Sequence, residues 1–331
     1  MLQQVFHERN RMMTMSRLLD LRRVRVVAVG HPAADVMTFG LHEADGRALE
    51  PFAPGAHIDV QIPGGPVRQY SLCGSVVASG AYTIAVKREP ESRGGSSGMH
   101  ERITVGALLS IGGPRNHFPL APGKHPSLFI AGGIGITPIT AMIAELHEKK
   151  RDWTLHYCAR SEQHAAFHRE LAKLSDGRVH TYFSEKPMLD VEALISRESP
   201  DTHIYCCGPK PLMDAVARAA SAWPENQVHF EWFTAPANDT GPNTAFEIEL
   251  ARSGVVLTVP SDRTILQVLR DNGYHVNSAC EEGLCGTCET AVVSGEPEHR
   301  DTVLSAEERS ANNTMMVCVS RAKGSRLVLN L

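Results

Sequence analysis

The sequence predicts a protein of three modules: an antiparallel β-barrel, a doubly wound α/β domain and a small α+β domain. The first third of the chain consists of short β-like runs separated by Gly and Pro, which is typical of a barrel. From Ser127 strands alternate with helices, as in a parallel sheet. Beyond a polar stretch, four cysteines lie near the carboxyl end. A chain of 331 residues is also too long for one ordinary core.

The barrel prediction covers residues 19–122 and depends on six runs with strand character. Turn residues separate these runs, which lie at residues 24–29, 36–41, 57–62, 69–72, 82–87 and 108–111. Many short strands at this spacing favour a small antiparallel barrel. Residues 1–18, which hold four of the eleven methionines, are expected to be an N-terminal extension without a function of their own.

Residues 123–233 are predicted to form the doubly wound α/β domain. An apolar run begins at Ser127, a Gly-rich turn follows, and a helical pattern extends from Ile139 to Glu148. Further strands are expected over residues 153–158, 179–183, 191–195 and 203–207, with helices over residues 165–174 and 211–222. In such a sheet, ligands bind at the edge formed by the carboxyl ends of the strands.

A predicted linker precedes the third module. Residues 234–244 (TAPANDTGPNT) contain almost nothing apolar and are rich in Pro, Gly, Asn and Asp. Over residues 245–331 we expect a hairpin of strands at 246–250 and 255–259, a helix over 264–271, and then a loop of cysteines.

Composition and charge exclude several classes of protein. With 42% hydrophobic residues, 21% charged residues and a formal charge of −4, the chain resembles an ordinary soluble globular protein and not a polybasic nucleic-acid binder. Its apolar runs are far shorter than the roughly 18 residues that a membrane span needs. The N-terminus lacks the pattern of a secretory signal. We therefore expect a cytoplasmic protein without nucleic-acid or membrane partners.

The cysteine spacing is the strongest signal in the sequence. Cys280, Cys285 and Cys288 form a C-x4-C-x2-C loop, and Cys318 follows after 29 intervening residues. This is the spacing of plant-type [2Fe–2S] proteins, in which three thiolates from one loop and a distant fourth hold an Fe2S2 rhomb. A structural zinc site also uses four thiolates, but zinc ribbons usually present two short pairs. The four cysteines are thus predicted to be cluster ligands.

The cysteine loop and two later segments carry a resemblance to a known family. Residues 280–288 (CEEGLCGTC), 299–301 (HRD) and 316–323 (MVCVSRAK) resemble the C-terminal ferredoxin domain of phthalate dioxygenase reductase and vanillate demethylase reductases. The resemblance extends over nearly the whole chain from about Leu19. It implies a β-grasp fold for the third module, and FMN, NADH and [2Fe–2S] as cofactors.

Three segments of the barrel are candidates for flavin binding. These segments read RQYSL at 68–72, IAVKR at 84–88 and RGGSS at 93–97. A flavin needs a flat wall for its ring and cationic or amide donors for its phosphate. The resemblance implies that the FMN site comprises Arg68, Tyr70, Ser71, Ala85, Val86, Lys87, Gly94, Gly95, Ser96, Thr137 and Phe233. FAD stays open, although no extra aromatic segment for an adenine is obvious.

Two turns of the α/β domain are candidates for nicotinamide binding. The turn at 132–138 (GGIGITP) opens a helix, so its backbone N–H groups can meet a pyrophosphate. The turn at 205–209 (YCCGP) follows a later strand of the same sheet, and the pair resembles the nicotinamide half of ferredoxin–NADP reductase-like enzymes. The expected NAD-binding residues are Gly132, Gly133, Gly135, Arg160, Cys207, Gly208 and Pro209.

The same resemblance implies that Cys207 and Glu231 lie near the nicotinamide ring, as candidate catalytic residues. Cys206 is expected to be a buried strand residue. Arg160 has no second basic residue beside it to bind an adenosine 2′-phosphate, so we expect NADH, while NADPH stays possible.

Together the modules suggest an oxidoreductase that passes electrons from NADH through FMN and the cluster to a separate protein. No Cys-x-His pair occurs, so the chain cannot build a Rieske centre itself. The resemblance implies a Rieske non-haem iron oxygenase as acceptor, for dioxygenation or O-demethylation of aromatic compounds. A P450 or a quaternary-amine oxygenase is an alternative acceptor, and an iron–sulfur redox sensor is the non-enzymatic alternative.

The charge of the third module bears on docking. Between Asn243 and Leu331 there are 12 Asp or Glu and 8 Lys or Arg, so this segment carries the whole formal charge. Glu281 and Glu282 lie beside the predicted cluster. We expect this acidic module to dock on a basic patch of the acceptor.

Overall fold

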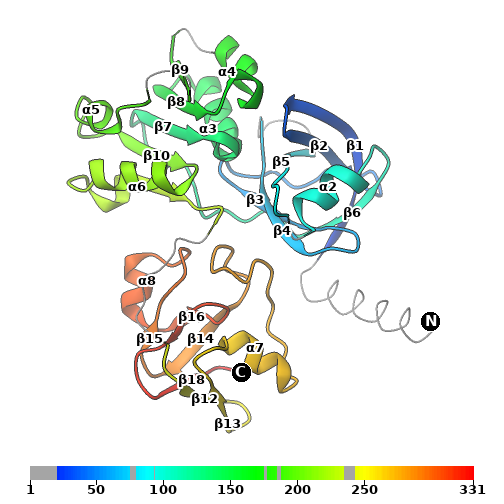
Figure 1. The fold of residues 1–331 in the computed structure, drawn as a ribbon, viewed down its shortest axis with the longest axis vertical. Coiled ribbons are helices and arrows are strands. Elements are labelled where there is room, and N and C mark those ends of the chain that lie inside the picture. Colours follow the sequence, from blue (N-terminus) through cyan, green and yellow to red (C-terminus); the bar gives the residue numbers. More distant parts are fainter. Residues whose placement is uncertain (1–20, 75–79, 93, 175–176, 185–187, 235–242) are drawn as a thin grey trace. The chain divides into compact units, whose positions relative to one another are not determined.

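The computed structural model describes residues 21–74, 80–92, 94–174, 177–184, 188–234 and 243–331 (Figure 1). The chain divides into two compact units, Met1–Phe233 and Thr234–Leu331. The predicted extension at 1–18 and most of the predicted linker, residues 235–242, lie outside the described residues, as does Arg93 of the expected flavin segment.

The first part of unit 1 is an antiparallel sheet of six strands in the order β4-β3-β6-β1-β2-β5. A bridge between Leu72 and Ile84 joins its two edges, which closes the sheet into a barrel. The core is aliphatic, because alternate residues such as Val24 and Val26 point inward and are fully buried. The strands are β1 Arg22–Ala33, β2 Val36–Glu43, β3 His57–Gln61, β4 Val67–Ser71, β5 Ala81–Lys87 and β6 Leu108–Ile111, and helix α2 spans Ser96–Arg102.

The second part of unit 1 is a parallel sheet of five strands in the order β11-β10-β7-β8-β9. Its central strand is buried over all six residues. The strands are β7 Ser127–Gly132, β8 Trp153–Ala159, β9 Val179–Phe183, β10 His203–Cys207 and β11 Val228–Glu231. The helices are α3 Ile136–Glu148, α4 His168–Leu174, α5 Val191–Ile195 and α6 Lys210–Ala219.

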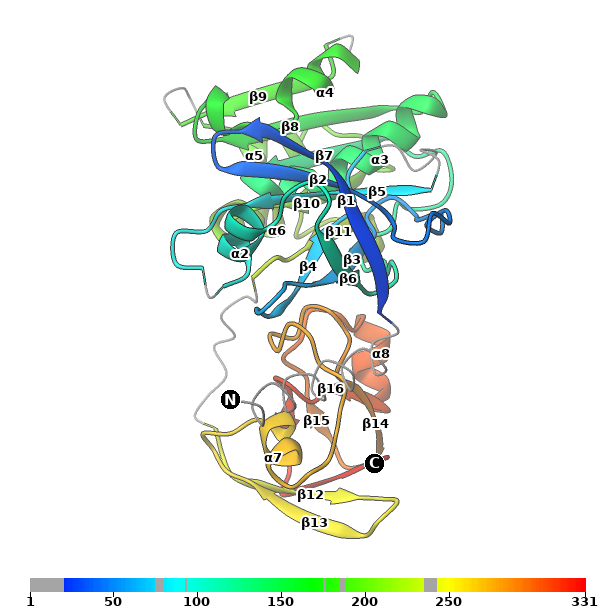
Figure 2. The ribbon, with the colours of Figure 1, turned by 90° about the vertical axis from the view of Figure 1, so that its right-hand side faces the viewer.

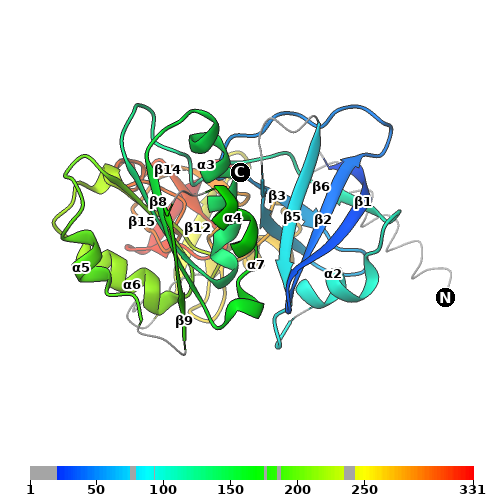
Figure 3. The same cartoon turned by 90° about the horizontal axis from the view of Figure 1, so that it is seen from above.

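Helices cover both faces of this sheet, as Figure 3 shows. Ile139 and Ile143 of α3 pack with Phe129 and Tyr205 on one face. Val191 of α5 and Met213 of α6 pack on the other face. The carboxyl ends of the five strands consequently share one edge, which carries the glycine turns.

One predicted strand is wrong. Residues 191–195 form the short helix α5, because the Asp190 side chain accepts a hydrogen bond from the backbone N–H of Ala193 and caps the first turn. Val191 and Ile195 are both buried, and they are four residues apart, which is the spacing of one helical face. A short apolar run does not distinguish helix from strand by periodicity alone.

The barrel and the α/β part form one body within unit 1. At the tip of the β1–β2 hairpin, the backbone N–H of Ala34 donates to the carbonyl of Gln163 at 2.8 Å. The backbone N–H of Ala121 donates to the hydroxyl of Tyr205, also at 2.8 Å. None of the helices in the described part of the chain is long and apolar enough to cross a membrane.

Unit 2 is a mixed sheet of five strands in the order β13-β12-β18-β14-β16. Strands β12 and β18 pair in parallel, which places the first and last strands of the unit side by side. Helix α7 lies beside this sheet (Figure 2), and Thr264 and Gln267 close its first turn in a capping box. This is the β-grasp arrangement. The strands are β12 Phe246–Leu250, β13 Val255–Val259, β14 Glu289–Ser294, β15 Pro297–Glu298, β16 Thr314–Met316, β17 Arg321–Ala322 and β18 Arg326–Leu329, and the helices are α7 Ile265–Asp271 and α8 Ala306–Ala311.

Candidate functional site

The expected phosphate end of the flavin site combines a cation with a glycine turn. Arg68 lies in β4, and its Cγ and Nε would be only 3.2 Å from a Cβ placed on Gly95. Gly94 has a φ of +84°, a conformation that side chains other than Gly rarely adopt. Ser96, the first residue of α2, accepts a hydrogen bond from the backbone N–H of Glu89 at 3.0 Å. The guanidinium group of Arg68 thus lies beside glycine backbone that no Cβ obstructs. This arrangement suits the binding of a phosphate group.

The expected wall for the flavin ring comes from β4 and β5. Tyr70 and Ser71 end β4, and Ala85 and Val86 are buried in β5. Burial raises the pKa of Tyr70 well above its usual value, so its phenol stays neutral. The ammonium of Lys87 pairs with Glu89 at 2.9 Å.

The two glycine turns of the parallel sheet pack backbone against backbone. A Cβ on Gly135 would lie 2.2 Å from the carbonyl oxygen of Cys207, and one on Gly208 would lie 2.9 Å from the Cα of Gly132. A Cβ on Gly132 would likewise meet Pro209 at 2.4 Å. Because Gly has no side chain, both turns can meet at the carboxyl ends of β7 and β10. This is where dinucleotides bind in such sheets, and the N-terminus of α3 adds backbone N–H groups.

Cys207, Glu231 and Ser71 meet where the barrel joins the sheet. Cys207 and Glu231 are paired in register on β10 and β11, and the Ser71 hydroxyl donates to Oε2 of Glu231 at 3.4 Å. Burial of the carboxyl group raises the pKa of Glu231 to about 8, although the Ser71 hydrogen bond opposes this shift. Burial, followed by the charge of Glu231, raises the pKa of the Cys207 thiol well above its ordinary value. At neutral pH both groups therefore hold their protons.

Two residues that the sequence did not single out belong to this group. The Cys73 thiol is buried 3.7 Å from the carbonyl oxygen of Ser71, and burial raises its pKa to about 12. The hydroxyl of Thr140 accepts a hydrogen bond from the backbone N–H of Gly74 at 3.2 Å. The spacing in the sequence could have indicated both residues. Cys73 is two residues beyond Ser71, as on one face of a strand, and Thr140 is one helical turn beyond Thr137, as on one face of a helix.

Arg160 and Phe233 lie toward the margins of unit 1. Arg160 follows β8 at the same edge as the glycine turns, and its side chain is exposed. Phe233 is 40% exposed at the end of unit 1. Trp232, beside it, packs with Phe230 and the aliphatic cluster beneath α5 and α6.

The four cysteines of unit 2 are neighbours, with Cys280 next to Cys285 and Cys288 next to Cys318. The backbone N–H groups of Glu282 and Leu284 donate to the Cys280 sulfur at 3.3 and 3.4 Å. Positive φ angles of 71° at Gly283 and 72° at Gly286 turn the loop back on itself.

Two thiols per pair match the two irons of an Fe2S2 rhomb, each of which takes two thiolates. Within the described residues, no group of three or more His, Cys, Asp or Glu converges on one point as a mononuclear metal site requires. The donor set thus fits a [2Fe–2S] cluster.

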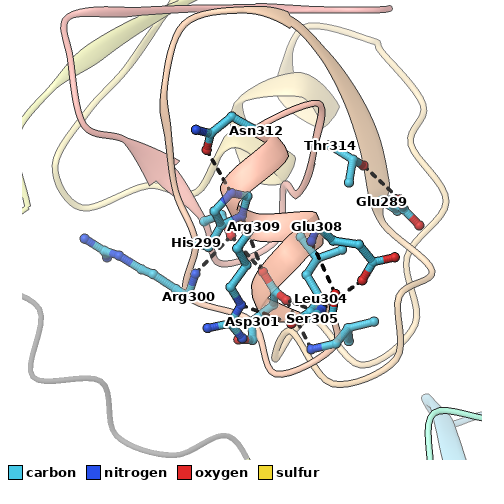
Figure 4. A network of polar contacts seen from close by, with 12 residues as sticks. Glu289, His299, Arg300, Asp301, Leu304, Ser305, Glu308, Arg309, Asn312 and Thr314 are labelled. Carbon is cyan, nitrogen blue, oxygen red and sulfur yellow. Dashed lines mark hydrogen bonds and ion pairs between the residues drawn. The ribbon is translucent and has the colours of Figure 1, made fainter. Parts of the chain in front are cut away.

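Asp301 belongs to the network of polar contacts drawn in Figure 4. Further hydrogen bonds link Asp301 and its neighbour Thr302 to both cysteine segments. The buried Asp301 carboxylate accepts hydrogen bonds from the backbone N–H groups of Val303 and Leu304 at 3.1 and 2.9 Å. Next to it, the backbone N–H of Thr302 donates to the carbonyl of Gly283 in the cysteine loop at 3.0 Å. The Ser320 hydroxyl, two residues beyond Cys318, donates to Asp301 at 3.5 Å. Arg309 donates to the Asp301 carbonyl at 2.6 Å.

Comparison with known proteins identifies the modules. The oxidoreductase NAD-binding domain family matches residues 129–218, and the 2Fe-2S iron-sulfur cluster binding domain family matches residues 248–323. The chain is 44% identical over 313 residues to the phenoxybenzoate dioxygenase subunit beta of Ectopseudomonas oleovorans, covering 93% of this chain and 97% of the relative. It is 40% identical over 314 residues to the phthalate dioxygenase reductase of Burkholderia cepacia, covering 93% and 97%.

The chain belongs to the phthalate dioxygenase reductase family. A solved structure of phthalate dioxygenase reductase matches with a TM-score of 0.70 and 39% identity, covering 94% of this chain and 98% of that one. An intact self-sufficient cytochrome P450 monooxygenase matches with a TM-score of 0.88 and 39% identity. The match covers 94% of this chain but only 41% of that longer protein.

Family membership confirms the predicted fold class, the oxidoreductase activity and the three cofactors. The protein is an NAD(P)H-dependent oxidoreductase with flavin and [2Fe–2S] cofactors, and its relatives include reductases of phenoxybenzoate and phthalate dioxygenase systems. The assignment of individual residues to the flavin, nicotinamide and cluster sites stays a prediction. The positions of these residues in the structure are compatible with it.

Proposed function

We propose that the protein is the reductase component of a two-component Rieske non-haem iron oxygenase that acts on an aromatic acid or an aryl ether. One observation carries the proposal: within one compact unit, Ser71 of the flavin wall contacts Glu231 beside the nicotinamide turns, and the same chain supplies the four clustered cysteines. Relatives of similar length serve phenoxybenzoate, vanillate and phthalate oxygenases.

In this proposal each module of the chain has one role in electron transfer. Residues 19–122 bind FMN, residues 123–233 bind NADH, residues 234–244 link the units, and residues 245–331 hold the cluster, with a cytoplasmic location. When bound, the flavin accepts two electrons from NADH and releases them one at a time to the cluster.

The residues of unit 1 orient the reactants and keep water out. Arg68 and the turn at Gly95 hold the flavin phosphate, and the turns that meet at Gly135 and Cys207 hold the dinucleotide. Glu231 is neutral below about pH 8, so its carboxyl can donate a hydrogen bond toward the nicotinamide without placing a buried negative charge there.

The cluster loop contributes backbone dipoles. The N–H groups of Glu282 and Leu284 both aim at the Cys280 sulfur, and such donors stabilise negative charge on a thiolate ligand. Cys280 is more exposed than the other three ligands, which are buried, so this side of the site lies toward solvent. We propose that electrons leave the protein on this side.

The surface beside the cysteine loop, on which we propose that the acceptor docks, is less acidic than the sequence suggests. Glu281 forms an ion pair with Arg270 at 2.7 Å, and both side chains are partly exposed. The pair reduces the net negative charge beside the cluster. Docking on a basic acceptor surface then depends more on the excess of acidic residues over the whole of unit 2.

A P450 acceptor is a second candidate, because the self-sufficient P450 contains a portion that closely resembles this chain. A carnitine monooxygenase reductase subunit at 42% identity keeps a quaternary-amine oxygenase as a third. These acceptors are distinguished by adding each oxidised protein to the reductase and NADH without oxygen. The proposal predicts rapid reduction of a Rieske centre and slow reduction of P450 haem.

The first test is an anaerobic titration of the purified protein with NADH, followed by visible absorbance and low-temperature EPR. Bleaching of the flavin, appearance of a [2Fe–2S] signal and release of FMN on denaturation would support the proposal. If the reduced protein transfers no electrons to any Rieske oxygenase but reduces P450 haem rapidly, the assigned acceptor is wrong.

A further inference from the structure

Thr140 lies on α3 at the point where the barrel meets the α/β part of unit 1. It is 7% exposed and is one helical turn beyond Thr137, the last residue but one of the GGIGITP turn. Its hydroxyl donates to the carbonyl of Thr137 at 2.7 Å and accepts from the backbone N–H of Gly74 at 3.2 Å. One hydroxyl therefore bonds to both halves of the unit.

On the barrel side, Thr140 contacts Gly74, which lies in the segment directly after β4, the strand that carries part of the proposed flavin wall. Gly74 comes three residues after Ser71, whose hydroxyl bonds to Glu231. The thiol of Cys73 lies between them, buried beside both Thr140 and the Ser71 carbonyl. The position of residues 71–74 is thus tied to α3 by side chains on the inner face.

On the α/β side, the contact continues into the nicotinamide turn. The hydroxyl of Thr137 donates to the carbonyl of Ile134 at 2.9 Å, and Gly135 packs directly against the carbonyl of Cys207. A shift of α3 relative to Gly74 would therefore move the turn that holds the dinucleotide. The other contacts described above between the two halves are at Ala34, at Tyr205 and between Ser71 and Glu231, and none of them involves α3.

We propose that Thr140 is a positioning residue for hydride transfer, which fixes the spacing between the flavin wall at residues 71–74 and the nicotinamide turn at residues 132–137. It touches neither reactant in this assignment and acts through the backbone of Gly74 and Thr137. The inference rests on the proposed function for the placement of FMN and NADH.

The step that responds is the transfer of one hydrogen with its electron pair from C4 of the nicotinamide to the flavin. This transfer oxidises NADH to NAD+ and reduces the flavin by two electrons. Such steps need reacting atoms about 3–3.5 Å apart, and a displacement of about 1 Å can lower the rate on the order of 100-fold. Binding of NADH depends on many more contacts and is less sensitive to that displacement.

The test compares Thr140→Val, which keeps the shape but lacks the hydroxyl, with Thr140→Ser, which keeps the hydroxyl. Flavin reduction by NADH is followed by anaerobic stopped-flow absorbance, with unlabelled NADH and with NADH deuterated at C4. We expect the limiting rate in Thr140→Val to fall roughly 10- to 100-fold while the Kd for NADH changes less than about threefold. The deuterium isotope effect should grow, the NADH–flavin charge-transfer band should weaken, and Thr140→Ser should recover to within about threefold.

Several outcomes would overturn the proposal. Equal limiting rates in the wild type and Thr140→Val would do so, as would a Thr140→Ser variant as slow as Thr140→Val. Flavin content and the Kd for NADH report whether unit 1 is intact. If Thr140→Val does not retain flavin, Thr140→Ala, which leaves room for a water at Gly74, takes its place with the same criteria. A wild-type protein whose flavin is not reduced by NADH would instead contradict the proposed function.

Discussion

The hydroxyl of Ser71 donates a hydrogen bond to Oε2 of Glu231 across 3.4 Å, and this bond joins the last residue of β4 to the last residue of β11. The two residues are 160 positions apart in the sequence. One ends a barrel strand and the other ends the edge strand of the parallel sheet. The contact thus places the proposed flavin wall and the proposed nicotinamide site at one point.

Glu231 should make the stability of unit 1 depend on pH. Burial raises its pKa from the ordinary 4.5 to about 8, so the neutral form is the one that favours the fold. The resulting stability is complete below about pH 4.5 and is lost as the pH rises through about 8. Each unit of pKa shift corresponds to about 1.4 kcal/mol.

We therefore expect the wild-type melting temperature, followed by flavin release, to fall several degrees more between about pH 6 and pH 8.5 than that of Glu231→Gln. Gln is neutral at every pH and matches the shape of the carboxyl group. Parallel pH profiles for the two proteins would show that Glu231 does not titrate in this range.

The four-cysteine assignment predicts a clean separation of the two cofactors. Replacing Cys318 with Ser should abolish the iron–sulfur EPR signal, while NADH still bleaches the flavin in unit 1. Cys158→Ser is the control, because Cys158 is a half-buried thiol in β8 whose pKa burial raises to about 11. Iron and sulfide analysis should give full occupancy in the control. A cluster that persists in Cys318→Ser with normal spectra would remove this residue from the ligand set.

A methyl group at Gly135 should separate the two nicotinamide turns. Its Cβ would lie 2.2 Å from the Cys207 carbonyl oxygen, and backbone must move to relieve that overlap. We expect Gly135→Ala to cost about 1–3 kcal/mol of stability and to weaken NADH binding, measured by calorimetry. The control Gly324→Ala introduces a Cβ with no atom within 4 Å and should change neither quantity. Tight NADH binding by Gly135→Ala would argue against this turn as the dinucleotide site.

Arg68 should be needed to retain the flavin. A hydrogen bond between charged groups contributes about 1.5–3 kcal/mol, so Arg68→Ala is expected to raise the Kd for FMN roughly 10- to 100-fold. Fluorescence of released flavin after dilution measures this change. Arg47→Ala is the control, because Arg47 lies outside the three candidate flavin segments and forms an exposed ion pair with Asp45 at 2.7 Å. If both variants lose FMN equally, Arg68 has no special role at the phosphate.

Asp301 should stabilise the cluster by holding its loops. Both backbone N–H groups, of Val303 and Leu304, donate to Oδ2 of Asp301, and the Ser320 hydroxyl donates to Oδ1. Asn carries no negative charge and has an NH2 group in place of one carboxylate oxygen, so it cannot accept all three bonds in this arrangement. Asp301→Asn is therefore expected to lose its visible iron–sulfur absorbance several-fold faster in the presence of a chelator. Glu307→Gln, an exposed change on α8, serves as the control. Equal rates of cluster loss in the two variants would contradict this role.

Much of the fold was predictable because its signals are local. Strands 246–250 and 255–259 appear as β12 and β13 with the predicted bounds, and the helix expected over 264–271 begins at Ile265 because Thr264 is its N-cap. The error at α5 arose because a five-residue apolar run fits either helix or strand, and a cap at Asp190 decided between them.

The sequence by itself determined the chemistry that depends on short spacing: the C-x4-C-x2-C loop, the glycine turns, and through their resemblance the family and its cofactors. These signals depend on covalent geometry over a few residues. Tertiary structure alone decided that Ser71 meets Glu231, that Thr140 bonds to Gly74, and that the four thiols lie as two pairs. Such contacts join segments that are far apart in the chain, and only the burial of shared cores fixes the distance between them.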